Sequence, residues 1–228
     1  MSFWQGFPTN RLLADLSLWS ADLTRLREEI MRVDPYADLY HLDVSDAHFH
    51  SESFPRSGFC CCSAAVRPVT RKKFHVHLMV DKPQSLIDAF AEAGADMISI
   101  QMGNEPLVKS CLEQIEKANC AAGVAFKVDE DPGLVVPYLD FIEVVTMLGT
   151  ALGVKGQSIS QNAYFRIERM RSIIARASPN EIRVAADGGI RSDTVPQLRA
   201  AGADIVVMGS LAFKSDNLSK TFGWLRSL

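Results

Sequence analysis

Short apolar runs alternate with longer amphipathic runs along the whole chain. Continuous apolar runs of this length are typical of parallel strands that are buried on both faces. We predict strands at Leu12–Ser17, Asp38–Val44, Phe74–Met79, Met97–Gln101, Ala121–Phe126, Phe141–Met147, Ile182–Ala186 and Asp204–Met208. We predict helices at Leu23–Val33, Cys60–Val66, Gln84–Ala93, Pro106–Ala118, Pro132–Tyr138, Gln161–Ala177, Thr194–Ala201 and Ala212–Leu225.

This alternation amounts to eight strand–helix units. Within 228 residues it favours an α/β fold, a closed (β/α)8 TIM barrel, over an open doubly wound sheet. No low-complexity linker divides the sequence, so we expect residues 1–228 to form a single domain. The segments Ala93–Asp96 and Ala201–Asp204 repeat one Ala-Gly-Ala-Asp turn, in which glycine ends a helix shortly before the next strand.

Composition narrows the class of protein further. The net charge of −3 gives no sign of nucleic-acid binding or of attraction to an anionic membrane. No apolar run reaches the roughly 20 residues needed to cross a bilayer, and the N-terminus lacks the features of a signal peptide. The five cysteines match no zinc motif, so we interpret Cys60–Cys62, Cys111 and Cys120 as packing residues. We therefore expect a cytoplasmic protein.

Residues that can bind metals stand at the ends of several predicted strands. His41 and Asp43 end the second strand, His75 and His77 lie in the third, and Asp187 directly follows the seventh. Residues i and i+2 of a strand share a face, so each pair can converge on one point. The carboxyl ends of barrel strands meet at the active-site face, which predicts a metal site there. Because a metal-bound carboxylate can also transfer protons, an enzyme is favoured over a binding module.

Each of these residues also has a structural interpretation. His75 and His77 are compatible with a surface pair or with packed histidines, and Asp187 with a turn before two glycines. Ser17 and Gln101 carry little weight alone, although both end predicted strands. The convergence of several such residues on one face favours the metal site.

Glycines after the last two strands suggest a second ligand group. Gly188 and Gly189 follow the seventh strand, and Gly209 and Ser210 follow the eighth. Loops at these places often present backbone N–H groups to a phosphate, and glycine allows the anion to approach closely. Two tight turns would explain the same residues, but their occurrence after both strands favours a phosphorylated substrate.

Five motifs, spread over nearly the whole chain, resemble the ribulose-phosphate 3-epimerase family. Ser17–Asp22 is similar to the opening Ser-x-x-Ser-Ala-Asp of that family, and His41–Asp46 to its His-x-Asp-x-Met-Asp. His77–Val80 matches its His-Leu-Met-Val, and Asp187–Gly189 its Asp-Gly-Gly. Gly209 and Ser210 match its closing Gly-Ser.

The resemblance implies a metal-dependent isomerase that inverts C3 of a ketose phosphate, by default D-ribulose 5-phosphate to D-xylulose 5-phosphate, through an enediolate. It implies one divalent ion (Zn, Fe, Mn or Co) and a homo-oligomer as one option. It gives His75 no role. The implied metal ligands are His41, Asp43, His77 and Asp187, with Asp43 and Asp187 as the acid/base pair. The implied substrate-binding residues are Ser17, His77, Gly153, Gly156, Gly188, Gly189, Gly209 and Ser210.

The chain departs from the family pattern at several positions. A family methionine is Ser45 here, and another aligns with Leu148 unless a one-residue shift brings Met147 into its place. A family histidine after the fourth strand is Gln101, and the sixth loop, residues 151–157, keeps two glycines but lacks the family proline. Two alternatives therefore stay open: an epimerase of another ketose phosphate, such as allulose 6-phosphate or a tetrulose phosphate, or a non-catalytic sugar-phosphate binding paralogue.

Overall fold

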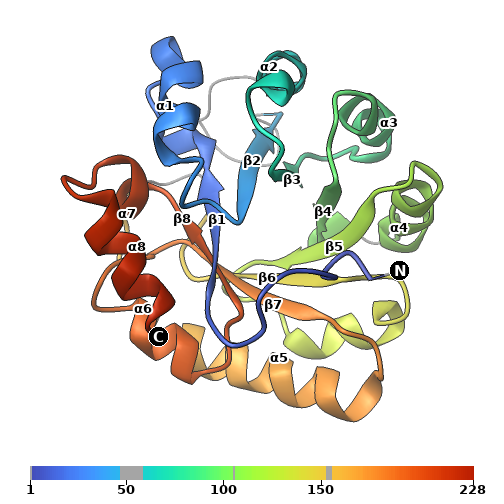
Figure 1. The fold of residues 1–228 in the computed structure, drawn as a ribbon. Helices are drawn as coiled ribbons and strands as arrows, with labels where there is room; N and C mark the ends of the chain where they lie inside the picture. The colour runs from blue at the N-terminus through green and yellow to red at the C-terminus, as the bar shows by residue number, and fades with distance from the viewer. Residues whose placement is uncertain (1, 47–58, 105, 153–155) are drawn as a thin grey trace.

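Eight parallel strands close into one barrel in chain order, with the last strand paired to the first (Figure 1). The computed structural model describes residues 2–46, 59–104, 106–152 and 156–228. The strands are β1 (Leu13–Ser17), β2 (Leu39–Ser45), β3 (Lys73–Met79), β4 (Met97–Gln101), β5 (Ala121–Phe126), β6 (Val144–Leu148), β7 (Arg183–Asp187) and β8 (Ile205–Met208). The prediction of a (β/α)8 barrel is confirmed.

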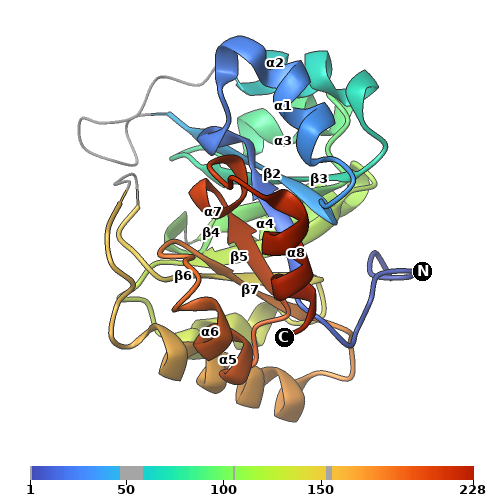
Figure 2. The same ribbon diagram turned by 60° about the vertical axis from the view of Figure 1, so that its left-hand side comes forward.

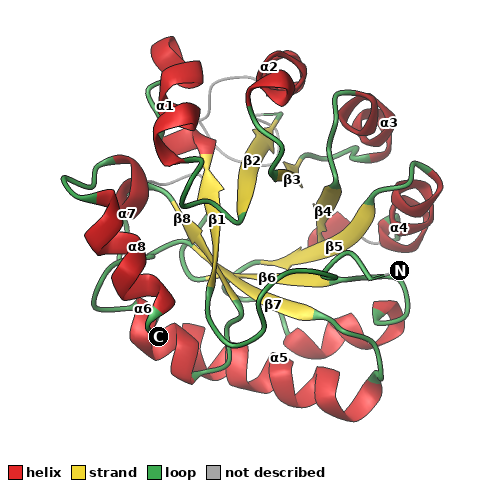
Figure 3. Ribbon diagram, viewed as in Figure 1, coloured by secondary structure: helices red, strands yellow, loops and turns green. Residues whose placement is uncertain are grey.

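Helices surround the barrel and cover the outer face of the strands (Figures 2 and 3). Helix α4 shows why: its buried residues recur at helical spacing, at Val108, Cys111, Leu112 and Ile115. The α-helices are α1 (Leu26–Val33), α2 (Phe59–Val66), α3 (Gln84–Glu92), α4 (Val108–Lys117), α5 (Ala163–Ala177), α6 (Val195–Ala200), α7 (Ser210–Phe213) and α8 (Leu218–Arg226). Short 3₁₀ helices are η1 (Leu18–Ser20), η2 (Leu23–Arg25), η3 (Arg67–Val69), η4 (Met102–Asn104) and η5 (Pro132–Tyr138).

The last predicted helix is wrong as a single element. The segment divides into α7 and α8, because Asn217 starts a new helix by accepting a hydrogen bond from the Lys220 backbone N–H at 2.9 Å. The helix predicted from Leu23 likewise begins as the 3₁₀ turn η2 and becomes α-helical only at Leu26.

Three further elements differ in type or in their first residue from the prediction, and two of them involve prolines. Pro132–Tyr138 is a 3₁₀ helix, since Pro132 and Pro137 have no N–H to donate to an α-helical ladder. Pro106 lies in the turn before α4 rather than in its first helical turn. The strand expected from Phe141 begins three residues later, because the Phe141 N–H closes a turn on the Tyr138 carbonyl at 2.9 Å.

Acidic residues precede all four even-numbered strands. They are Asp38, Asp96, Glu143 and Asp204. Each aspartate accepts a backbone N–H from the preceding strand, at 2.8–2.9 Å, and also pairs with an arginine. The repeated Ala-Gly-Ala-Asp turn is thus confirmed, and its aspartate ties each new strand to its neighbour.

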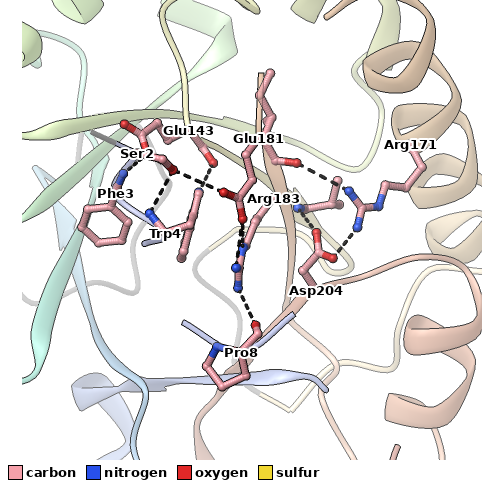
Figure 4. Close-up of polar contacts among 11 residues, drawn as sticks. Ser2, Phe3, Trp4, Pro8, Glu143, Arg171, Glu181, Arg183 and Asp204 are labelled. Carbon is pink, nitrogen blue, oxygen red and sulfur yellow. Dashed lines mark hydrogen bonds and ion pairs between the residues drawn. The ribbon is translucent and has the colours of Figure 1, made fainter. Parts of the chain in front are cut away.

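Trp4 is buried at the end of the barrel at which the strands begin, and Figure 4 shows the polar contacts around it. Its indole N–H donates to the Glu143 carbonyl at 2.7 Å, and the guanidinium of Arg183 lies 4.7 Å from its ring. In the same region Arg183 donates to the Pro8 carbonyl at 3.0 Å. Trp4 packs in one cluster with buried interior residues from six of the strands, which are Leu13, Leu39, Met97, Val144, Ala185 and Ile205. Apolar side chains therefore fill this end of the barrel interior.

Candidate active site

The alternation of side chains along β2 and β3 brings the candidate metal ligands together. On β2, Tyr40, Leu42 and Val44 pack in the core cluster beneath the helices, so His41 and Asp43 face the barrel interior. His77 faces the interior from β3 in the same way, and β7 ends at Asp187. Four ligand atoms, one from each of these side chains, lie within 4.8 Å of one another.

The chemistry of this group fits a divalent metal. His41 Nε2 and His77 Nδ1 are buried without a hydrogen-bond partner among the described residues. Both nitrogens face Asp43 Oδ1, at 3.3 Å and 3.5 Å. Two imidazole nitrogens and two carboxylates around one point form the mixed N/O ligand set that zinc, iron, manganese and cobalt accept. The cluster can therefore hold a metal ion.

The pKa values of the two aspartates in the cluster are shifted in opposite directions. Burial opposes the charge of Asp43, but the charge and close approach of the His41 and His77 imidazoles hold the pKa of Asp43 far below its usual range. Burial disfavours protonated His41 too, yet Asp43 and Asp15 raise the pKa of His41 well above its usual value. Burial and the charge of Asp43 together raise the pKa of Asp187 to about 6. Metal binding would require neutral His41, with its Nε2 lone pair free for the cation.

A cavity of about 470 Å³ opens above this cluster. Asp43 and Asp187 lie on its wall, together with Ser17, whose hydroxyl donates to Asp43 Oδ2 at 2.9 Å. Its other lining residues include Trp19, Ser20, Met79, Leu148, Gly156, Gly188, Gly189, Gly209, Ser210, Arg191 and Lys214. The structure thus brings the predicted glycine turns and two of the four candidate ligands, Asp43 and Asp187, to one cavity. His41 and His77 are fully buried and do not line it, and Gly153 lies outside the described residues.

The turn after β7 requires glycine. Gly188 and Gly189 have φ values of +83° and +71°, a conformation that other residues rarely adopt. A Cβ on Gly189 would also lie 2.8 Å from Ile159 Cβ. Arg191 fastens this turn to the sixth loop by donating to the Gly156 and Gln157 carbonyls at 3.2 Å and 3.3 Å. The backbone around the glycines is held close to the cavity.

Residues 14–213 match the model of the ribulose-phosphate 3-epimerase family. The chain belongs to this family. Ribulose-phosphate 3-epimerase from Chlamydia pneumoniae is 31% identical over 210 residues, covering 91% of this chain and 90% of that protein. The enzyme of the same name from Bacillus subtilis is 28% identical over 211 residues, covering 92% and 96%. The one from Rhodobacter capsulatus is 32% identical over 206 residues, covering 89% and 86%.

Solved structures of proteins with other names share the fold of this epimerase-family enzyme. KGPDC from Streptococcus mutans has a TM-score of 0.71 at 13% identity, covering 92% of this chain and 94% of that one. 3-Hexulose-6-phosphate synthase from Salmonella typhimurium has a TM-score of 0.68 at 18% identity, covering 94% and 96%. At such identities the likeness concerns the fold alone. Within the described ranges, no helix is both long and apolar enough to cross a membrane.

Strand register shows which of Leu148 and Met147 faces the cavity. Leu148 pairs with Asp187 and lines the cavity, whereas Met147 pairs with Ala186 and packs outward against the helices. The one-residue shift that would bring Met147 into the site is therefore wrong. Ser45 is buried at the end of β2, on the same face as Asp43.

Several polar residues of the site were missed from sequence. Arg191 and Lys214 line the cavity, but basic residues in loops give no signal by themselves. His75, for which the sequence suggested a surface or packed position, is buried and bonded to Asp15 at 2.8 Å. Asp15 carried a usable signal: it is a charged residue inside the apolar run Leu12–Ser17, on the same face as Ser17. Of the cysteines interpreted as packing residues, Cys111 and Cys120 are buried, and the side chains of Cys60–Cys62 lie outside the described part.

Proposed function

We propose that this chain is a divalent-metal-dependent epimerase that inverts C3 of a ketose phosphate, with D-ribulose 5-phosphate and D-xylulose 5-phosphate as the default pair. Family membership supports the reaction class. The observation that carries the proposal is that Asp43 and Asp187 belong to one metal-competent cluster and both line the same cavity.

Inversion of a carbon centre needs one group to remove a proton and another to return it to the opposite face. Asp43 and Asp187 reach the cavity from strands that are not neighbours, β2 and β7, which suits action from two sides. For one epimer the first carboxylate is the base and the second the acid, and for the other epimer the roles exchange. Ser17 would hold the Asp43 carboxylate in place by its hydrogen bond.

His41, Asp43, His77 and Asp187 would hold the metal. When bound, it would supply positive charge to offset the negative charge that develops on the substrate oxygens as the C3 proton leaves. Met79 and Leu148 give the cavity wall an apolar part, which would limit contact between water and the carbanion-like species.

The phosphate would bind at the other side of the cavity. Gly188, Gly189, Gly209 and Ser210 bring backbone close to the cavity, as loops after the last two strands of such barrels often do for phosphates. Arg191 and Lys214 line the same cavity and add positive charge suited to a phosphate dianion. Gly153 and Gly156 of the sixth loop stay predictions as substrate contacts.

Solvent deuterium exchange tests the reaction. The enzyme with added divalent metal is incubated with D-ribulose 5-phosphate in D₂O and followed by NMR. Deuterium at C3 together with D-xylulose 5-phosphate would support the proposal. If metal binds but no exchange occurs, the same assay on a hexulose and a tetrulose phosphate decides between another ketose phosphate and a non-catalytic binding protein.

Two substitutions test the acid/base roles. We expect Asp43→Asn and Asp187→Asn each to lower kcat by at least about 100-fold, since each removes a proton-transfer group. Asp140→Asn, which removes an exposed carboxylate outside the cavity, is the matched control and should keep full activity. Substantial turnover by either active-site variant, with a native circular dichroism spectrum, would refute the assigned role.

Other expectations from the sequence stay predictions. Metal analysis of the purified protein would distinguish zinc, iron, manganese and cobalt. A cytoplasmic location, a homo-oligomeric state and the absence of nucleic-acid binding are consistent with the family and the charge, and each needs its own measurement.

A further inference from the structure

A second group of polar side chains lies below the candidate metal ligands, inside the barrel. Asp15 of β1, His75 of β3 and Ser99 of β4 are all at most 1% exposed to solvent. Most barrel interiors are filled at this depth by branched apolar residues, and burying a charge without compensation is costly. The group therefore needs an explanation beyond packing.

Asp15 joins the two histidines that stand above and beside it. Its Oδ2 atom lies 2.9 Å from His41 Nδ1 and 2.8 Å from His75 Nδ1. An ionised carboxylate only accepts hydrogen bonds, so both imidazoles must carry a proton on Nδ1. A neutral His41 then has its lone pair on Nε2, which is the nitrogen that faces Asp43 in the metal cluster.

The hydrogen bond between His75 and Ser99 also fits a proton on His75 Nδ1. His75 Nε2 lies 2.8 Å from Ser99 Oγ, and with its proton on Nδ1 it accepts from the serine hydroxyl. Gly123 on the next strand makes room for that hydroxyl, because a Cβ there would lie 2.3 Å from Ser99 Oγ. The sequence of donors and acceptors from Ser99 to His41 is therefore consistent at every step.

We infer that Asp15 is a positioning residue of the metal centre: with His75 and Ser99 as its support, it fixes the tautomer and ring orientation of His41. The inference rests on the proposed metal site. A carboxylate behind a metal-binding histidine raises the basicity of the ligand nitrogen and holds the ring in place. Loss of such a partner typically weakens metal binding by about 10- to 100-fold.

The other metal histidine has a neutral partner at the same place. The amide nitrogen Nε2 of Gln101 lies 2.6 Å from His77 Nε2, while Gln101 Oε1 has no partner among the described residues. Exchanging the oxygen and nitrogen of this amide satisfies the oxygen and leaves His77 Nδ1 free to face the metal. His41 thus bonds to the charged carboxylate of Asp15, whereas His77 bonds to the neutral amide of Gln101. A charge-assisted hydrogen bond is the stronger of the two, so Asp15 holds its histidine more firmly than Gln101 does.

Graded substitutions of Asp15 test the inference through metal affinity rather than activity. Asp15→Asn keeps an acceptor but removes the charge, and Asp15→Leu removes both. We expect the dissociation constant for zinc, measured by chelator competition, to rise by about 10- to 100-fold in Asp15→Leu and by less in Asp15→Asn. The visible spectrum of the cobalt(II) form should change in the same order.

Thr146→Val is the matched control. Thr146 is another buried interior residue, and its hydroxyl has no partner among the described residues, so its loss should change neither metal affinity nor the cobalt spectrum. Equal effects of Asp15→Leu and Thr146→Val would show a general packing response and overturn the inference. Wild-type affinity in both Asp15 variants would overturn it as well.

A measurement on the unaltered protein keeps the inference testable if the variants do not fold. Long-range ¹H–¹⁵N spectra of the zinc-loaded protein report which nitrogen of each imidazole carries a proton. We expect His41 and His75 both to be protonated at Nδ1. A His41 proton on Nε2 would refute the positioning role of Asp15, as would a second metal ion bound between Asp15 and the histidines. A wild-type protein that binds no metal would instead refute the metal centre, and the inference with it.

Discussion

Replacing Trp4 should lower the stability of the barrel without changing the opposite end, which holds the candidate metal ligands. Trp4 is 1% exposed and packs against buried interior residues from six of the strands. Its ring meets Phe3 and Phe7 edge to face, with centroids 4.9 Å and 5.5 Å away, and the Arg183 guanidinium lies over it at 4.7 Å. Trp4→Ala would leave a void at the floor of the barrel.

The expected loss follows from these contacts. Truncation of a fully buried tryptophan to alanine costs about 3–5 kcal/mol in the free energy of unfolding. The hydrogen bond to Glu143 contributes about 1 kcal/mol of this, because the Glu143 carbonyl keeps its second donor, the Arg183 backbone N–H at 3.0 Å. We therefore expect a loss of about 4 kcal/mol for Trp4→Ala, and of about 1 kcal/mol for Trp4→Phe, which removes mainly the N–H.

Calorimetry and denaturant titration measure this loss. In a chain of this size each kcal/mol lowers Tm by about 2–4 °C, so Trp4→Ala should melt about 8–16 °C below the wild type and Trp4→Phe about 2–4 °C below it. The kcat at a temperature where all variants are folded should be unchanged, since Trp4 lies at the opposite end from Asp43. A Tm loss below about 2 °C for Trp4→Ala, or equal losses for both variants, would refute this account of the barrel floor.

Three further predictions concern the site. Chelation should abolish turnover and lower Tm, since a ligand that binds the native state stabilises it, and one divalent metal should restore both; full activity after verified metal removal would contradict this. Gly189→Ala should raise KM about tenfold, because φ +71° and the approach to Ile159 strain the turn by 1 kcal/mol or more; steady-state kinetics with an unchanged KM would contradict it. Gly123→Ala should cost about 1–3 kcal/mol in stability, because its Cβ would lie 2.3 Å from both Ser99 Oγ and Val144 Cγ1; an unchanged Tm in thermal melts would contradict it.

Local pattern in the sequence was enough for much of the fold. Met97–Gln101 and Ala121–Phe126 have the predicted bounds, and the other strands begin or end within a few residues of them. Buried parallel strands are short apolar runs, and the helices between them have one apolar face. Both patterns are properties of short segments, so the alternation of strands and helices could be predicted from the sequence. The same regularity placed His41 and Asp43 on one face of β2, since side chains alternate along any strand.

Other features depended on where the chain folds back. The two differences in the helices did not, because Pro137 lacks an N–H and the Asn217 side chain caps a new helix, and both effects are local. Arg191 and Lys214 became part of the cavity only because their loops turn toward it.

The clearest division between sequence and structure lies inside the barrel. From sequence alone, His41, Asp43, His77 and Asp187 could be selected as candidate ligands, because strand ends, spacing and motif resemblance are properties of short segments. Asp15 and His75 are 60 residues apart in sequence, and only the closed barrel showed that Asp15 Oδ2 lies 2.8 Å from His75 Nδ1. Hydrogen bonds between strands depend on register and on barrel closure, which no short segment specifies, so the support beneath the metal centre was decided by the tertiary structure.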